Sequence, residues 1–486
     1  MTNLKKEILN AIKDIGFTKP TVIQSKTIPY LINSKEDIIA TAQTGTGKTG
    51  AFGLPSIHLT NIEVKKPQTL ILCPTRELCI QISNDLDTFS KYISGIKIVP
   101  VYGGSSIEKQ IRSLKQGAHV IVGTPGRTVD MIKRKKLSLK YIDRVVLDEA
   151  DEMLSMGFKD DLDLILSKTP TQKQILLFSA TMGKKILSIT KKYMNDPINI
   201  ASSETNSSTK QVDHYYYMVQ AKFRYEVLKR IADMNPNIYG IIFCRTRRET
   251  KEVSNKLMQD GYNADSLHGD LTQSQRDEVM DRFRKKRIQL LVATDVASRG
   301  IDVDSLSHII NYNFPDESEV YIHRSGRTGR AGKRGISILI INTREMNKIK
   351  AIEKNFKISF KHEKIPSGND ICTKQLFALI DKIEKVEVDE TQIEQFLPKI
   401  YKKLDWLSRE ELIKHFVSAE FNKFLSYYKN SKDLNLLSNR IDRKKEKVKP
   451  NRNKKLFSNI YINIGSKNKL NPSNLIGIIN EVLKSD

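Results

Sequence analysis

The chain has 486 residues, which is more than one hydrophobic core usually serves, so two or three domains are expected. Lysine and arginine total 81 against 56 aspartates and glutamates, and the formal charge of +25 favours a polyanionic partner such as nucleic acid, with a Lys-rich codon bias as the plainer explanation. No run of 18 apolar residues occurs, and residues 1–17 have an amphipathic helical pattern, so neither a membrane span nor a signal peptide is expected.

The four cysteines have no metal-ligand spacing. Two of them, Cys73 and Cys244, lie in strand-like runs as small hydrophobic residues. This usage fits a reduced, cytoplasmic location.

Short apolar runs alternate with helical patterns through the first 200 residues. The strand-like runs are residues 38–40, 69–72, 96–99, 120–122, 145–147 and 175–178. This alternation predicts a parallel, doubly wound sheet, with ligands bound at the carboxyl ends of its strands. After a polar linker at 204–211, further strands are expected at 240–243, 290–292, 308–311 and 336–341. We therefore expect two α/β domains, at residues 1–203 and 212–345.

The pattern becomes helical over residues 346–432, which we interpret as a helical extension. Its apolar stripes would more often pack on their own domain, and a homodimer through the extension is the minority interpretation. Residues 433–456 are strongly basic and are expected to be a flexible polycation, or simply a solubilising tether.

Residues 42–49 contain the parts needed to hold a nucleoside triphosphate. The glycines allow main-chain N–H groups to surround phosphate oxygens, and Lys48 and Thr49 would open a helix whose positive end faces the anion. Lys48 is expected to contact the β and γ phosphates, and Thr49 to bind Mg²⁺. The residues assigned to the nucleotide here are Ala42, Gln43, Thr44, Gly45, Thr46, Gly47, Lys48 and Thr49. Ala42 replaces the usual glycine, and a chance glycine turn is the competing interpretation.

An acidic tetrapeptide, Asp148-Glu149-Ala150-Asp151, follows the apolar run at 145–147. Asp148 can hold a hydrated Mg²⁺ ion, and Glu149 can orient the attacking water and accept its proton. Such a tetrapeptide is usually a solvated turn, but its place after a buried strand favours the catalytic interpretation.

Together with further motifs in the same order, these segments resemble the DEAD-box RNA helicases over nearly all of residues 1–345. The further motifs are Gly16 to Gln24, Pro74-Thr75-Arg76-Glu77-Leu78, Gly103-Gly104, Thr124-Pro125-Gly126-Arg127, Ser179-Ala180-Thr181, Asp295 to Asp302 and His323 to Arg330. The resemblance implies two tandem RecA-like domains that bind ATP, Mg²⁺ and RNA. A catalytically idle RNA clamp and a DNA helicase are the alternatives.

The Gln24 amide can donate and accept at once, which matches the N6 and N7 edge of adenine and favours ATP. The resemblance makes Gln24 the adenine reader, and it adds Phe17, Gly300 and Asp302 to the nucleotide site, with Asp302 at the ribose. The resemblance also implies an aromatic residue further upstream that stacks on the base. No aromatic residue precedes Phe17 in this sequence, so we expect adenine binding to be weaker than in the family by up to ~1–3 kcal/mol.

The resemblance also implies roles for residues that respond to the γ-phosphate. Arg327 and Arg330 become arginine fingers, because a guanidinium fork suits the charge that develops there. Three more residues, His323, Ser179 and Thr181, would couple the magnesium site to closure of the two domains.

RNA is expected to lie across both domains, gripped through its phosphates without regard to base sequence. The assigned residues are Pro74, Thr75, Arg76, Gly103, Gly104, Thr124, Pro125, Gly126 and Arg127, with Gly269 and Thr294 added by resemblance. The expected activity is ATP-dependent unwinding of short duplexes or remodelling of RNA–protein complexes. Structured or ribosomal RNA is the expected target, in ribosome assembly, cold adaptation or mRNA turnover.

Residues 457–486 are similar to the start of the RRM-like RNA-binding module that ends the DbpA and DeaD types of this family. That module needs four strands and two helices, and roughly 30 residues cannot close such a core. We therefore expect either a truncated module or a segment that packs elsewhere in the protein.

Overall fold

The computed structural model describes residues 4–42, 45–201, 211–298, 303, 305–329, 333–387, 389–429 and 431–435. The chain divides into two compact units, residues 1–436 and 437–486, and every described residue belongs to the first. Several sequence expectations lie outside the described residues. They are most of the linker at 204–211, most of the basic stretch at 433–456, the tail at 457–486, and Gln43, Thr44, Gly300, Asp302 and Arg330.

The first domain is built on a parallel sheet of seven strands in the order β3-β4-β2-β5-β6-β1-β7. The strands are β1 (Ile38–Thr41), β2 (Thr69–Leu72), β3 (Ile98–Val101), β4 (Val120–Gly123), β5 (Arg144–Leu147), β6 (Gln174–Ser179) and β7 (Ile198–Ala201). Alternate residues of the buried strands enter two separate hydrophobic clusters, so both faces are covered. The expected parallel, doubly wound sheet is therefore confirmed.

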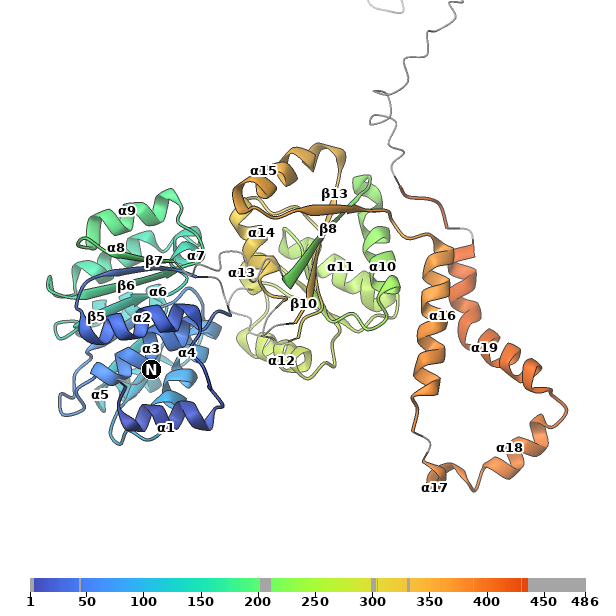
Figure 1. Cartoon of the computed structure of the whole chain (residues 1–486), viewed down its shortest axis with the longest axis horizontal. Coiled ribbons are helices and arrows are strands. Elements are labelled where there is room, and N and C mark those ends of the chain that lie inside the picture. Colours follow the sequence, from blue (N-terminus) through green and yellow to red (C-terminus); the bar gives the residue numbers. More distant parts are fainter. Residues whose placement is uncertain are drawn as a thin grey trace, which may run out of the picture. The chain divides into compact units, whose positions relative to one another are not determined.

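Helices cover both faces of this sheet (Figure 1). They are α1 (Lys6–Asp14), α2 (Val22–Asn33), α3 (Lys48–Leu59), α4 (Arg76–Phe89), α5 (Ile107–Lys115), α6 (Pro125–Lys133), α7 (Ala150–Ser155), α8 (Lys159–Ser167) and α9 (Lys184–Tyr193). One cluster packs α1 to α4 on the sheet, and the other packs α6 to α9. None of the helices among the described residues has the length and apolar character to cross a membrane.

The third strand lies two residues later than the sequence pattern indicates, at 98–101 instead of 96–99. Its register is set by pairing with β4, where Ile98 lies opposite Val120. Pro100 is tolerated because β3 is an edge strand and pairs on one side only.

The second domain has another parallel sheet of seven strands, in the order β10-β11-β9-β12-β13-β8-β14. The strands are β8 (Val212–Met218), β9 (Gly240–Phe243), β10 (Ala264–Leu267), β11 (Leu290–Ala293), β12 (His308–Asn311), β13 (Gly335–Ile341) and β14 (Phe360–Glu363). Its helices are a short 3-10 turn η2 (Ala221–Phe223), α10 (Arg224–Met234), α11 (Arg247–Gln259), α12 (Gln273–Arg284), α13 (Asp295–Ser298), α14 (Ser318–Ser325), a second 3-10 turn η3 (Thr343–Glu345) and α15 (Met346–Phe356).

The sheet of the second domain extends past residue 345, where the sequence pattern placed its end. The edge strand β14 pairs with β8, and Ile349, Ile352 and Phe360 join a cluster that packs on the sheet. Sequence patterning missed β14 because only Phe360 of its four residues is buried. A helical extension nevertheless follows, beginning at residue 368 instead of 346.

The extension consists of α16 (Gly368–Glu384), α17 (Glu390–Ile393), α18 (Leu397–Leu404) and α19 (Arg409–Lys429). Helices α16 and α19 lie side by side, and α16 also packs on α10 of the second domain (Figure 1). Ser408 and Glu411 form a capping box before α19, with each side chain bonded to the other residue's backbone N–H.

A buried polar network fixes the base of the extension to α10. The fully buried Arg230 donates from Nη1 to the Pro366 carbonyl at 3.1 Å and from Nη2 to the Lys432 carbonyl at 2.7 Å. One helical turn later, Asp233 accepts hydrogen bonds from the hydroxyls of Tyr262 and Tyr428. Both ends of the extension are thereby tied to the same helix.

Replacing Arg230 with methionine should loosen this base, because the Pro366 and Lys432 carbonyls lose their charged donor. We expect Arg230→Met to lower the free energy of unfolding by about 1–3 kcal/mol and to speed proteolytic release of residues 368–432. The matched control is Arg248→Met, since the Arg248 side chain is 90% exposed and pairs only within its own helix. Urea titration and limited proteolysis measure the difference, and equal behaviour of the two variants would contradict the anchoring role.

Candidate functional site

Strand order brings together residues that are far apart in the sequence. The segments after β1, β6 and β5 are the phosphate loop, Ser179 to Thr181 and Asp148-Glu149, and these three strands are neighbours in the sheet. Because the strands are parallel, all three segments leave the same edge. The site therefore lies where a parallel sheet usually binds its ligand.

The phosphate loop has the backbone that its glycines allow. Gly45 and Gly47 have φ of +80° and +85°, and Gly47 caps the amino end of α3. A Cβ atom on Gly47 would lie 2.6 Å from Nε2 of Gln24, so a larger residue would clash as well as strain the turn. The loop and Gln24 are thus built against each other.

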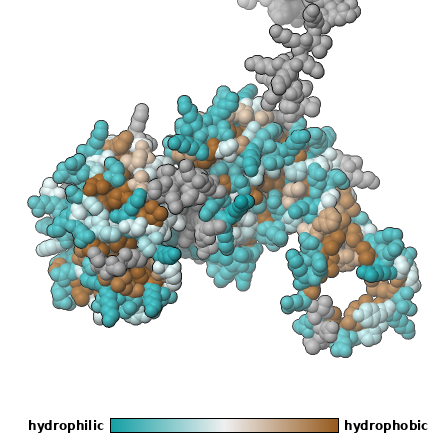
Figure 2. All heavy atoms as spheres, in the orientation of Figure 1, coloured by the Kyte–Doolittle hydropathy of each residue, from teal (hydrophilic) through white to brown (hydrophobic). Residues whose placement is uncertain are grey.

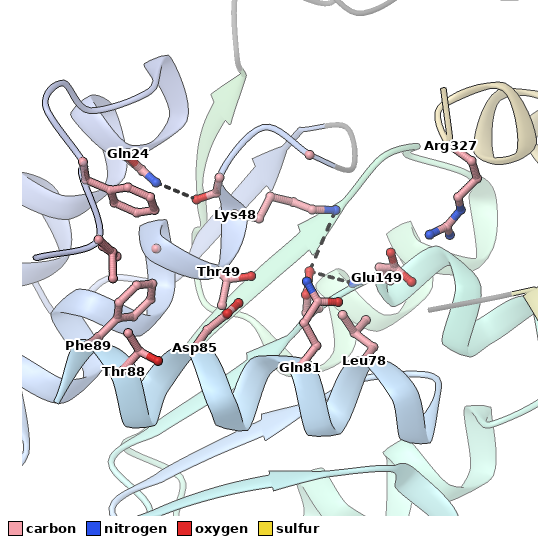
Figure 3. Close-up of a pocket in the computed structure, with 16 residues that line it drawn as sticks. Gln24, Lys48, Thr49, Leu78, Gln81, Asp85, Thr88, Phe89, Glu149 and Arg327 are labelled. Carbon is pink, nitrogen blue, oxygen red and sulfur yellow. Dashed lines mark hydrogen bonds and ion pairs between the residues drawn. The ribbon is translucent and has the colours of Figure 1, made fainter. Parts of the chain in front are cut away.

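Lys48 is buried at the start of α3, with only 7% of its surface exposed. Its Nζ atom lies 3.9 Å from Oδ1 of Asp148 and has no hydrogen-bond partner among the described residues. Oε2 of Glu149 is likewise buried without a partner in the described part of the chain (Figure 3). Unsatisfied buried groups are rare in folded proteins, so these atoms fit a bound phosphate and its attacking water.

The two carboxylates at the end of β5 differ in environment. Burial raises the pKa of Asp148 to about 6, even though Lys48 acts in the opposite direction. Glu149 has left-handed backbone angles, with φ of 50° and ψ of 49°, a conformation that costs a non-glycine residue about 1–3 kcal/mol. Such strain is typical of functional positions. Oxygen ligands from Thr49 and Asp148 suit a magnesium ion at this point.

A cavity of about 420 Å³ opens beside these residues (Figure 3). Arg327, which follows α14 in the second domain and is 8% exposed, lines the same cavity as Lys48 and Glu149. The structure thus brings one of the two expected arginine fingers to the phosphate loop.

Gln24 lines this cavity as well, and part of its amide is already engaged. Its Nε2 group donates to the Gly47 carbonyl at 3.0 Å, and its Oε1 atom accepts from the backbone N–H of Thr21 at 3.1 Å. One N–H and one lone pair remain for a base. The half-exposed Phe17 ring lies next to it in the cavity wall, 6.4 Å from the ring of Phe89.

One wall of the cavity was not anticipated from the sequence. It is formed by one face of α4, with Leu78, Gln81, Asp85, Thr88 and Phe89. The spacing of the polar residues among them, 81, 85 and 88, places them on the same helical face. This polar stripe, on the helix that follows β2, is the sequence feature that could have identified the wall.

Asp151 connects segments from both domains. Its Oδ2 atom accepts hydrogen bonds from the Thr181 backbone N–H at 3.0 Å and from Thr181 Oγ1 at 2.9 Å. The same atom lies 3.4 Å from Nε2 of His323, whose Nδ1 contacts Glu152. The Ser179 hydroxyl in turn donates to the Thr181 carbonyl at 2.6 Å. Of the three residues expected to couple the domains, Thr181 and His323 therefore meet at one carboxylate, and Ser179 contacts Thr181.

These contacts shift the pKa values of both partners. Burial lowers the pKa of His323, but its contacts with the carboxylates of Asp151 and Glu152 outweigh burial and raise the pKa to about 10. Burial raises the pKa of Asp151, but the adjacent His323 charge brings it well below the ordinary value. The imidazolium and carboxylate are thus the stable pair at neutral pH.

Arg324 positions the helix that carries His323. Its Nε and Nη2 atoms donate to the two oxygens of Asp295, at 2.6 and 2.7 Å, and Nη1 donates to Asn311 at 2.9 Å. The guanidinium is 3% exposed, so this network is a fixed part of the second domain. The sequence motif contained Arg324, but its positioning role was visible only in the fold.

The residues expected to bind RNA follow β2, β3 and β4. These strands are neighbours on the β3 side of the sheet, so the residues lie along the same edge as the phosphate loop but farther from β1. Arg76 lies 5.1 Å above the Tyr102 ring and donates to the Gly104 carbonyl at 3.4 Å. Arg127 donates to the Ser105 carbonyl at 3.4 Å. Thr75 caps α4, while Thr124 and Pro125 start α6. These residues lie together with the glycine pair 103–104 and Gly126.

The second domain also reaches this part of the edge. Gly269 follows β10 and Thr294 follows the neighbouring strand β11. From α12, Arg276 donates to Glu77 at 3.2 Å, and Asp277 lies 3.5 Å from Arg76. Both domains therefore contribute to the region assigned to RNA.

Family models match three parts of the chain. A DEAD/DEAH box helicase model covers residues 21–189, a model of the helicase conserved C-terminal domain covers 223–332, and the helical domain of a probable ATP-dependent RNA helicase covers 371–429. The chain is similar to the DEAD-box ATP-dependent RNA helicase CshA of Geobacillus kaustophilus, at 42% identity over 79% of this chain and 82% of the relative. DeaD of Mycobacterium tuberculosis is 41% identical over 77% of this chain and 66% of its own.

The chain is also similar to solved structures. Saccharomyces cerevisiae Dbp5 bound to RNA and ADP BeF3 is 31% identical, with a TM-score of 0.69, and the match covers 78% of this chain and 97% of Dbp5. Mss116p bound to ssRNA and AMP-PNP is 28% identical, with a TM-score of 0.67, over 88% of this chain and 90% of the other.

A phosphate loop beside paired carboxylates on one RecA-like sheet, completed by an arginine from a second such sheet, defines a nucleotide-driven motor of the helicase class. The chain belongs to the DEAD/DEAH box helicase family and is an ATP-dependent RNA helicase of the DEAD-box type. The family expected from the sequence motifs is thus confirmed.

The contact of His323 with Asp151 and Glu152 should depend on pH. The pKa of His323 in the folded protein, about 10, is above the ordinary histidine value of 6.5. The contact therefore stabilises the folded state fully below pH 6.5, and this stabilisation is lost as the pH rises toward 10. We expect His323→Gln to lower the melting temperature most near pH 6, and the difference from wild type to shrink steadily up to pH 10. The exposed His362 supplies the control variant His362→Gln. A difference that grew with pH would contradict the assignment.

Proposed function

We propose that this helicase hydrolyses ATP in the cavity between Lys48 and Arg327, and that RNA binding across the two domains completes the site. The observation that carries the proposal is the presence of Arg327 in the same cavity as Lys48, Asp148 and Glu149. The Lys48 ammonium, which has no hydrogen bond in the described chain, supports a role in binding phosphate. Arg330, three residues after Arg327, is proposed as the second finger.

In the proposed mechanism Lys48 and the backbone of the phosphate loop bind the β and γ phosphates. Thr49 and Asp148 would hold magnesium, which supplies charge neutralisation at those phosphates when bound. Glu149 orients the water in line with the γ-phosphate and accepts its proton. Arg327 then stabilises the charge that develops on the transferred group, an effect of about 10³–10⁵ in rate for such fingers.

Domain closure is the proposed link between RNA and hydrolysis. Asp151 accepts from Thr181 in the first domain and pairs with His323 in the second, so it can report closure to the adjacent Asp148 and Glu149. RNA gripped by Arg76, Arg127 and the facing loops of the second domain would favour the closed state. The solved relatives bound to RNA and a nucleotide analogue support this arrangement. Bending of one strand on closure would open short duplexes locally.

We also propose a cytoplasmic role on structured RNA, in ribosome assembly, cold adaptation or mRNA turnover. Its support is the formal charge of +25, which favours large polyanionic partners, and the similarity to DeaD and CshA.

The decisive test is ATP hydrolysis measured with no nucleic acid, total RNA, ribosomal RNA and DNA. We expect RNA to stimulate ATP hydrolysis by the wild type strongly. Glu149→Gln should abolish hydrolysis and still bind ATP. Arg327→Lys should reduce kcat by about 10³-fold or more and bind ATP with unchanged affinity. Arg248→Lys, on an exposed helix face, is the matched arginine control. Equal activity under all four conditions, or full activity of Arg327→Lys, would overturn the mechanism.

We further propose that two copies associate through the helical extension. Large apolar side chains are exposed along it, and hydrophobic atoms gather there in Figure 2. The most exposed are Phe377, Val386, Phe396, Tyr401, Ile413 and Trp406, the last at 75%. Exposed apolar side chains gathered in one region often mark an interface, and a two-fold dimer buries the same patch on both partners.

Light scattering on the full chain tests this association. We expect the wild type to elute as a dimer and Phe377→Asp to elute as a monomer, because a buried unpaired carboxylate opposes the interface. Lys382→Asp, on the exposed part of the same helix, should leave the dimer intact. A monomeric wild type at micromolar concentration would contradict the proposal.

A further inference from the structure

A large cavity lies at the edge of the first sheet opposite to the ATP site. Its volume is about 890 Å³, and it is formed where β1, β2, β5 and β6 begin and where α2 and α3 end. The catalytic segments leave the other ends of the same strands. The volume is in the range of about 300–1,000 Å³ that small-molecule sites occupy. This cavity is therefore separate from the nucleotide and RNA sites described above.

Arg144, the first residue of β5, is the unusual group in its wall. The residue is 9% exposed, and its Nε atom donates to Gln174 Oε1 at 2.9 Å. Its Nη1 and Nη2 groups make no hydrogen bond within the described chain, and no carboxylate of that part lies within 4.0 Å of the guanidinium. Burial lowers the pKa of Arg144 to about 10, so the group is still a cation at neutral pH.

Two other buried polar groups of the cavity, Asp37 and Gln174, are already paired. Asp37 accepts from the backbone N–H groups of Ile175 at 2.6 Å and Asn195 at 2.8 Å, so both its oxygens are occupied without Arg144. Gln174 uses its amide N–H on the carbonyl of Glu36 at 2.8 Å. The Arg144 fork thus lines the cavity with four N–H donors on Nη1 and Nη2 that make no hydrogen bond within the described chain, and a ligand in the cavity could accept from them.

We propose that this cavity binds a small polar molecule carrying one carboxylate, held by a bidentate pair with the Nη groups of Arg144. A planar carboxylate matches the guanidinium fork and would satisfy the unused donors. A single negative charge is favoured because bases and acids are balanced in the described wall. The charged residues there are Lys35, Arg144, Lys173, Glu36, Asp37 and Asp143. The wall therefore offers one directed cation and no broad positive field of the kind that suits polyphosphates.

The experiment uses the full chain and four probes at matched ionic strength: lactate, glutamine, lactamide and inorganic phosphate. Saturation-transfer NMR and thermal shift should show binding of the two carboxylates and none of lactamide, the uncharged match for lactate. Arg144→Met should weaken lactate binding about 10- to 100-fold, and Arg144→Lys, which keeps the charge and loses the fork, should fall between.

Two further measurements keep the test decisive. Lys35→Met removes an exposed charge from the same cavity and should bind lactate like the wild type. RNA-stimulated ATP hydrolysis by each variant reports whether that variant is folded. If Arg144→Met is not folded, binding of the four probes to the wild type still tests the proposal. Binding of phosphate in place of the carboxylates, equal loss in Lys35→Met and Arg144→Met, or no binding of any probe would each overturn the proposal.

Discussion

The buried ammonium of Lys48 is the constraint on which the rest of the site depends. It is held 3.9 Å from Asp148 at the adjoining strand end and has no hydrogen bond in the described chain. A buried charge that is only half compensated is stable when a strongly anionic ligand completes its surroundings. The sheet order β5-β6-β1 creates this situation, because it places the phosphate loop and the acidic segment on one edge.

One carboxylate, Asp151, contacts residues of both domains. Its bonds to Thr181 are internal to the first domain, while its pair with His323 is made across to the second. Arg324 holds the helix that supplies His323 through a bidentate pair with Asp295, so the contact is made by a rigid element. Direct contacts thereby connect His323 of the second domain to Asp151, two residues after Glu149.

The strands of the first sheet carry different chemistry at their two ends. Strand β5 begins with Arg144 and is followed by Asp148, and β6 begins with Gln174 and ends at Ser179. The carboxyl ends face the nucleotide cavity, while the amino ends form the wall of a separate polar cavity. A short parallel strand with a fully buried middle thus joins two solvent-facing sites, and its few residues must satisfy both.

The sequence by itself determined the family, the two parallel sheets and most of the nucleotide site, because glycine turns, buried apolar strands and strand-end carboxylates are local patterns. It did not reveal β7, β8, β10 or β14, whose residues are polar, aromatic or exposed, and it ended the second domain too early because β14 was missed. Only the tertiary structure placed Gln81 and Asp85 in the cavity wall and brought Arg327 to Lys48. It alone also left the Nη groups of Arg144 without a hydrogen bond in the described part of the chain, because strand order and the packing of distant segments decide which side chains meet.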